Sequence, residues 1–262
     1  MKRVYYDGFT FIEFAIVLLI IGLLLGSLLG PLSTRLESEE RQKTQAMMED
    51  MKEALIGFAQ MNGRLPCPDA FTSGDGIEDP AVGGTCTRHE GWVPWVTLDT
   101  PQGDIWGNRF RYCVTKPRFT TPDNGTCDTA NNDPLTSNGD FDLCSSGSID
   151  IQTRNSAKAL VNVAGAVPAL IISHGHNGYG ATRIDGTPRP LVPATNDDED
   201  HNATNTCNPL GGATKRMRTF TAEGTPCSDE SGTSPLCEFD DLVVWISPNI
   251  LKNRMVTAGR LP

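Results

Sequence analysis

An uncharged block near the N-terminus constrains the fold of this chain more than any other feature. Residues 14–32 form a run of 19 residues without a charged side chain. A helix of about 20 such residues is long enough to cross the hydrocarbon core of a bilayer. The basic residues Lys2 and Arg3 lie before the block, and the positive-inside rule then puts the N-terminus in the cytoplasm and everything after residue 32 outside it.

The composition of the next thirty or so residues predicts that the helix continues. Residues 33–62 contain no Pro and a single Gly, and they are rich in Glu, Gln, Lys, Met and Ala, which favour helices. Met47, Met51, Leu55 and Phe58 recur at three- and four-residue spacing, which is typical of a helix face packed on a domain core. We therefore expect a membrane-spanning assembly helix over 9–32 and its amphipathic continuation over 33–62.

The remainder, residues 63–262, has the composition of a β-rich head. Gly, Pro, Asn, Asp and Thr are frequent there, and they separate short strand-like runs at 109–114, 148–152, 167–173 and 239–247. These patterns predict an α+β fold, in which a long N-terminal α-helix packs on an antiparallel β-sheet head and its first half spans the membrane.

All the cysteines follow the uncharged block, on the side predicted to lie outside the cytoplasm. An even number scattered among turn-rich segments indicates disulfides formed in an oxidising compartment. A zinc site is the alternative, but the closely spaced pairs typical of one are absent. The pairing stays open, although Cys227 and Cys237 are natural neighbours. The disulfide candidates are Cys67, Cys86, Cys113, Cys127, Cys144, Cys207, Cys227 and Cys237.

A carboxylate stands at the entrance of the uncharged block. Glu13 follows Gly8-Phe9-Thr10-Phe11-Ile12. A secretory signal peptide would have a shorter apolar core, and a plain single-pass anchor gives no reason for a charge that is costly to bury. This segment, with a short basic leader before it and an apolar run behind it, resembles the prepilin processing motif of type IV pilins and type II secretion pseudopilins.

The resemblance implies how the N-terminus is processed. A prepilin peptidase would remove the leader, residues 1–8, by cutting after Gly8, and would methylate the new N-terminal residue Phe9. Glu13 would neutralise the amine of a neighbouring subunit and set the axial register of a filament. The partners are then the prepilin peptidase, other pilin or pseudopilin subunits and the inner membrane.

An acidic run in the head is the sharpest local feature after the N-terminus. Oxygen-bearing side chains at this density can surround calcium, which takes 6–8 oxygen ligands, although such a run is more often a solvated loop. Related pseudopilins bind calcium in the same region of the chain. The candidate calcium ligands are Asn196, Asp197, Asp198, Glu199, Asp200 and Asn202, with Asp240 and Asp241 as additional ones. No other cofactor is required.

The net charge of −10 makes nucleic acid an unexpected partner, because an acidic chain repels phosphate. We expect no enzymatic activity, since Ser173 and His174 are only neighbours in sequence and no nucleophile motif is present. The function expected from the resemblance is a structural subunit, a minor pilin or pseudopilin, of a type IV pilus or type II secretion filament. Its location would be the bacterial inner membrane, single-pass, with the head periplasmic or extracellular in the filament.

Two other functions are the alternatives. One is a tip adhesin that recognises a surface or partner through loops 182–238, and the more remote one is a membrane-anchored enzyme.

Overall fold

The computed structural model describes residues 10–80, 85–122, 140–208, 213–222, 226–230 and 233–261, and the side chains of these residues except 24–34. The chain forms two compact units, Met1–Lys43 and Thr44–Pro262. We call the second the globular unit. The predicted leader and the processing residues Gly8 and Phe9 lie outside the described residues.

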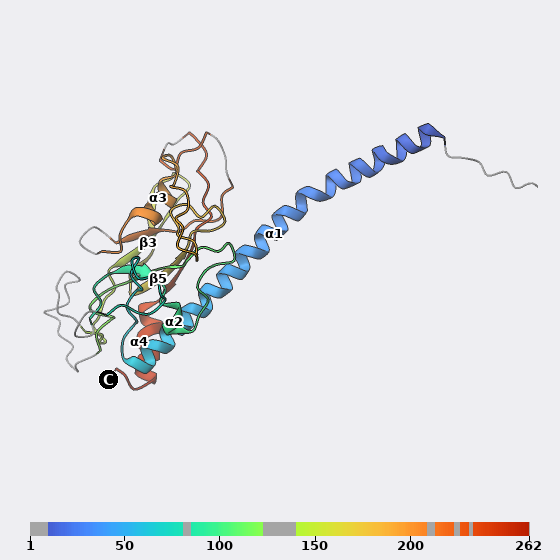
Figure 1. Ribbon diagram of the computed structural model, residues 1–262. Helices are drawn as coiled ribbons and strands as arrows, with labels where there is room; N and C mark the ends of the chain where they lie inside the picture. The colour runs from blue at the N-terminus through green and yellow to red at the C-terminus, as the bar shows by residue number, and fades with distance from the viewer. Residues whose placement is uncertain are drawn as a thin grey trace, which may run out of the picture. The chain divides into compact units, whose positions relative to one another are not determined.

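Four helices and seven strands make up the described fold (Figure 1). The helices are α1 (Phe11–Asn62), α2 (Trp95–Leu98), α3 (Asp197–Thr204) and α4 (Pro248–Thr257). The strands are β1 (Glu90–Trp92), β2 (Arg111–Val114), β3 (Ile149–Arg154), β4 (Leu160–Val167), β5 (Ala169–Ser173), β6 (Thr214–Arg216) and β7 (Leu242–Ile246).

The first unit contains the N-terminal part of α1, which is 52 residues long in all. Its large apolar side chains between Phe11 and Leu23 are 44–91% exposed. No helix in the described part of the chain combines the length and the apolar composition that crossing a bilayer requires. The apolar stretch whose side chains are described, residues 14–23, covers only about half of the ~20 residues needed. The predictions of a membrane-spanning first half and of a single-pass inner-membrane location are therefore contradicted.

The globular unit has two sheets, and the prediction of one antiparallel sheet is wrong. The first sheet has the order β1-β2-β5-β7 and is antiparallel throughout. The second has the order β4-β3-β6, and β6 runs parallel to β3. A second sheet forms because β5 is buried along its whole length, so both faces of the first sheet need an apolar cover.

The C-terminal part of α1 covers one face of the first sheet. Met51 and Leu55 of the helix are fully buried in one cluster with Tyr112 of β2, Ile171 of β5 and Val244 of β7. Their strands align these residues, since Tyr112 faces Ile171 and Ile171 faces Val244 in the registers. α4 adds Leu251 and Met255 to the same cluster. This is the main core of the globular unit.

The second sheet covers the opposite face. Leu170 and Ile172, which alternate with Ile171 along β5, pack with Ile149 and Ile151 of β3 in a separate cluster. Side chains that alternate along a strand point to opposite faces of the sheet. The globular unit is thus layered as helix, first sheet and second sheet.

Candidate metal centre

The acidic run that reads as a loop in the sequence forms the short helix α3. Asn196 is its N-cap residue, and the side chain of Asn196 accepts a hydrogen bond from the backbone N–H of Glu199. Four acidic residues then occupy the first turn, where the partial positive charge of a helix N-terminus favours them. Helical geometry separates these acids, because Glu199 and Asp198 are buried while Asp200 is exposed.

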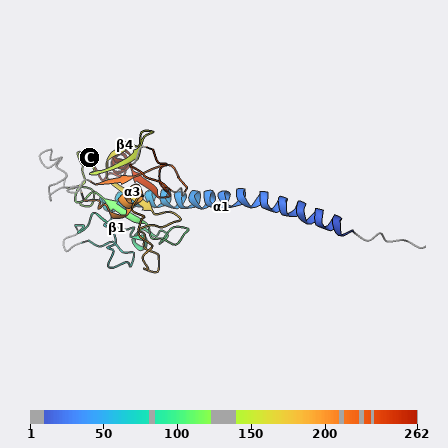
Figure 2. The ribbon, with the colours of Figure 1, turned by 90° about the horizontal axis from the view of Figure 1, so that it is seen from above.

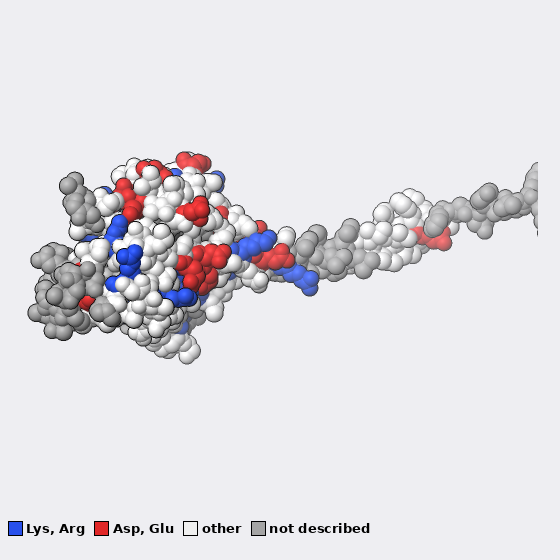
Figure 3. Space-filling model, turned by 90° about the horizontal axis from the view of Figure 1, so that it is seen from below, with Lys and Arg blue, Asp and Glu red and all other residues white. Residues whose placement is uncertain are grey.

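Three buried carboxylates meet between α3 and the start of β7. Glu199, Asp240 and Asp241 each offer one carboxylate oxygen, and these oxygens lie within 4.8 Å of one another. Acidic groups are also plentiful on the surface of the globular unit, where Figure 3 shows several red patches on the face drawn. The cluster differs from those patches because all three of its side chains are removed from solvent.

Neutral donors hold the three carboxylates in place. Asp240 donates its backbone N–H to Oε1 of Glu199 at 2.9 Å, and the backbone N–H of Asn177 donates to Oδ2 of Asp240 at 2.8 Å. The amide of Asn196 donates to Oε2 of Glu199 at 2.8 Å. Asn202 donates to Oδ2 of Asp241, also at 2.8 Å. These bonds orient the carboxylates without neutralising their charge.

His174, at the end of β5, is the nearest group that can carry a positive charge to Asp241. Its Nδ1 lies 3.3 Å from Oδ1 of Asp241, and both side chains are about 2% exposed or less. Neither ring nitrogen has a hydrogen-bond partner among the described residues. His176, two residues on, is exposed and packs edge-on against Trp106, so the two histidines do not form a chelating pair.

Burial and mutual repulsion dominate the electrostatics of this cluster. Burial, followed by the charges of Asp241 and Asp240, raises the pKa of Glu199 to about 9. Near neutral pH the cluster therefore takes up a proton unless another cation neutralises it. A divalent cation is the obvious substitute for that proton, and all three carboxylates are of the ligand type that calcium prefers.

The side-chain oxygens of the remaining candidate calcium ligands are engaged elsewhere or point away from the cluster. Asp198 accepts hydrogen bonds from Nε of Arg154 at 2.9 and 3.0 Å, and Nη1 of Arg218 lies 3.0 Å from it. The amide oxygen of Asn202 accepts the N–H of Arg216 at 2.7 Å. Asn196 is used as the helix cap. Asp197 and Asp200 lie on the outer side of α3, half-buried and exposed respectively. Of the eight candidates, the structure brings three carboxylates together.

Three disulfides join described segments of the globular unit. Cys67 bonds to Cys86, Cys113 to Cys207, and Cys227 to Cys237, with Cα–Cα distances of 5.2, 5.8 and 4.9 Å. The last pair is the natural neighbour pair of the sequence. Cys144 is also disulfide-bonded, and Cys127 lies outside the described residues.

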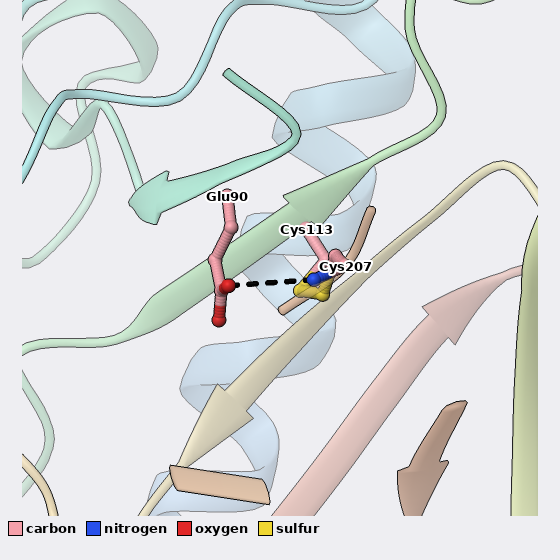
Figure 4. Close-up of side chains that lie close together, drawn as sticks. All are labelled: Glu90, Cys113 and Cys207. Atoms are coloured by element: carbon pink, nitrogen blue, oxygen red, sulfur yellow. Dashed lines mark hydrogen bonds between the residues drawn. A yellow bond between two sulfur atoms is a disulfide. The ribbon is translucent and has the colours of Figure 1, made fainter. Parts of the chain in front are cut away.

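The Cys113–Cys207 disulfide joins β2 to the segment just after α3. Figure 4 shows Glu90 beside it, where Oε2 of Glu90 accepts the backbone N–H of Cys207 at 3.4 Å. These three residues lie close enough to suggest a metal site. However, metal-binding cysteines act as thiolates, and the two sulfurs are bonded to each other. The group therefore serves to anchor the end of α3.

Glu13, the predicted assembly residue, closes the first turn of α1. Its Oε2 accepts hydrogen bonds from the backbone N–H and from Oγ1 of Thr10, both at 2.9 Å. These bonds lower the pKa of Glu13 below its usual value. A Thr-x-x-Glu pair bonded in this way is a capping box. Sequence reasoning missed this local role, although the spacing of Thr10 and Glu13 is its signature.

Comparison with known proteins finds no matching family model, no matching curated protein and no matching solved structure.

Proposed function

We propose that the chain is a non-enzymatic structural subunit of a pilin-like filament, a minor pilin or pseudopilin that a prepilin peptidase processes after Gly8. The observation that carries the proposal is the N-terminal half of α1. Between Phe11 and Leu23 the described helix presents large apolar side chains on every side, most of them about half exposed or more, and its single charge is Glu13.

An exposed apolar helix needs a cover, and equivalent helices of neighbouring subunits supply one. A bundle of such helices would bury the apolar side chains together, and this burial favours association in proportion to the area removed from water. It would also bury Glu13, which then needs a positive partner. The α-amine that processing would create on Phe9 of a neighbour has the required charge.

The surroundings of Ser173 support the non-enzymatic part of the proposal. Its hydroxyl donates a hydrogen bond to Oδ2 of Asp104 at 2.7 Å, and so it is not paired with the adjacent His174. Ser173 is also buried, so its hydroxyl is not exposed to a substrate in solution.

Electron microscopy of filaments sheared from the producing cells, with immunogold labelling of the globular unit, tests the assembly. We expect labelled filaments, and an intact mass that lacks residues 1–8. A chain that retains Met1 to Gly8 and is absent from every filament fraction would refute the proposal.

A second candidate function is binding of a divalent cation, calcium first, by Glu199, Asp240 and Asp241. The cluster of three buried carboxylates favours it, as does His174 beside them, whose ring nitrogens have no hydrogen-bond partner among the described residues. The ion would neutralise the cluster and tie α3 to the start of β7. Thermal melts of the purified chain in calcium and in a chelator test this. A higher melting temperature with calcium supports the site, and equal melting temperatures in calcium and in chelator would refute it.

A further inference from the structure

β4 is an exposed edge strand that lacks two of the usual protections of an edge, namely charge and proline. It lies at one end of the second sheet, and β3 is its one strand partner in the described part of the chain. Its sequence, Leu-Val-Asn-Val-Ala-Gly-Ala-Val, carries no charge and no proline. Leu160, Val161 and Val163 are 40–46% exposed. Edge strands are normally protected by charges, prolines or a covering segment, because their free N–H and C=O groups attract another strand. Figure 2 shows β4 at one side of the unit.

β7 is a free edge of a different kind. It ends the first sheet, paired only with β5, and its backbone makes no hydrogen bond outside that pair among the described residues. A groove of about 440 Å³ runs beside it. Its lining is apolar at Ile56 of α1, Trp245 of β7 and Ile250 of α4, and charged at Glu49, Lys52 and Glu53 of α1. The groove can therefore receive apolar side chains while the strand edge receives a backbone.

We propose that β4 of one copy of this chain pairs with β7 of the adjacent copy, and that the side chains of β4 enter the groove beside β7. One edge projects apolar side chains, and the other has a recess that is apolar in part. Neither strand carries a charge, and the charged groove residues are already in ion pairs, Glu49 with Lys52 and Glu53 with Arg254. In a chain with a net charge of −10, these two segments can approach without repulsion and without burying an unpaired charge.

The symmetry of this contact fits a filament. A contact between two different surfaces of the same chain is heterologous, so it can repeat from copy to copy. Such a contact generates an open helical array, unless the rotation between successive copies closes the array into a ring. The inference rests on the proposed function and adds that two copies of this chain are neighbours in the filament.

The size of the contact explains why it belongs to the assembled state. An eight-residue strand is about 26 Å long. A ribbon of that length and about 4.8 Å width offers less than the roughly 1,000 Å² that a stable interface buries. Free chains are therefore not held together by this contact alone. Subunits held side by side in a filament experience a high effective concentration, which makes the pairing favourable.

Charged substitutions on the β4 edge test the contact. Val161→Lys and Val163→Lys each put a charge where the adjacent copy would lie, and Ile184→Lys is the matched control, since Ile184 is 45% exposed and Val163 is 46% exposed. In cells making the full chain, we expect at least a tenfold loss of sheared filaments for both β4 variants. We expect none for the control. The near-ultraviolet circular dichroism of all three should match the wild type, which shows that the fold is intact.

A photo-crosslinking amino acid at position 163 identifies the neighbour. The expected product in filaments joins residue 163 to the peptide that contains residues 242–250 of another copy. A crosslink to β4 of another copy, or to a different protein, would overturn the proposed pairing. So would filaments at wild-type yield from Val163→Lys. The absence of filaments from wild-type cells would instead count against the proposed function, so the two failures are distinguishable.

Discussion

Thr10 and Glu13 bond reciprocally at the start of α1, because Glu13 accepts the N–H and the hydroxyl of Thr10 and the backbone N–H of Glu13 points to Oγ1 of Thr10 at 3.4 Å. Glu13 therefore has a local role in the single chain as well as its proposed role between subunits. A substitution that removes both roles together cannot tell them apart.

Glu13→Gln separates the two roles, because glutamine can complete a capping box but carries no charge. We expect Glu13→Gln to keep the helix content of the wild type and to lose filament assembly. Glu13→Ala should lose assembly and also fray the first turn. Circular dichroism and counts of filaments by electron microscopy measure the two effects. If Glu13→Gln forms as many filaments as the wild type, the charge of Glu13 has no role in assembly and the residue acts only as a helix cap.

Glu199→Gln distinguishes a cation from a proton at the carboxylate cluster. Because the pKa of Glu199 is raised to about 9, the residue is protonated at pH 7 when no cation is bound. The variant should then melt within a few degrees of the wild type in chelator. It should lose most of the stabilisation that calcium provides, which is about 2.7 kcal/mol at an ion concentration 100 times the Kd.

Asp200→Asn is the matched control for this test, since Asp200 lies on the same helix and is exposed. Its calcium-dependent shift should equal that of the wild type. Equal shifts for Glu199→Gln and Asp200→Asn would show that calcium acts elsewhere on the chain.

The disulfides differ in the length of chain they enclose, and their contributions to stability should differ accordingly. Cys113 and Cys207 are 94 residues apart, whereas Cys227 and Cys237 are 10 apart. A longer loop loses more entropy when it is closed in the unfolded chain. Replacing the first pair by alanine should therefore cost roughly 2 kcal/mol more than replacing the second. Denaturant unfolding of the two double variants measures the difference, and equal midpoints would contradict it.

His89 should make the globular unit less stable in mild acid. Burial, followed by the charge of Lys116, lowers the pKa of His89 to about 4 from 6.5. Between these values the unfolded chain binds the proton and the folded chain does not. The contribution of His89 to stability is therefore complete above pH 6.5 and is lost progressively as the pH falls towards 4.

The comparison of wild type with His89→Gln isolates this effect from other titrating groups. We expect the difference in unfolding free energy between the two proteins to shrink as the pH is lowered from 7 to 4. A difference that stays constant over this range would show that His89 titrates normally in the folded protein.

Several elements of the globular unit were predictable from local pattern. The strand-like runs at 109–114, 167–173 and 239–247 contain β2, β5 and β7, and the run at 148–152 covers β3 except for its last two residues. The predicted apolar stripe of the helix agrees with the structure at Met51 and Leu55, which are fully buried. It differs at its start, where Met48 is fully buried and Met47 only partly buried. Such patterns are readable because strand and helix periods mark which side chains face a core.

Other elements followed no such pattern. β4 was missed because its apolar residues are exposed and do not alternate with polar ones. The acidic composition of α3 favours a loop, and the helix forms nonetheless with Asn196 as its N-cap residue. The sequence predicts eight candidate ligands for the carboxylate centre. It does not indicate which three of them meet, because the local sequence pattern does not show which side chains face one another.

The amino-acid sequence by itself determined the N-terminal helix, its capping by Thr10 and Glu13, and the strands whose alternation marks a buried face. These depend on residues within a few positions of one another, where spacing alone sets geometry. Only the tertiary structure decided that a second sheet covers the first, that Glu199 meets Asp240 and Asp241, and that β4 is left with a free edge. Those outcomes depend on contacts between segments tens of residues apart, which form when the apolar faces of the sheets and helices pack against one another.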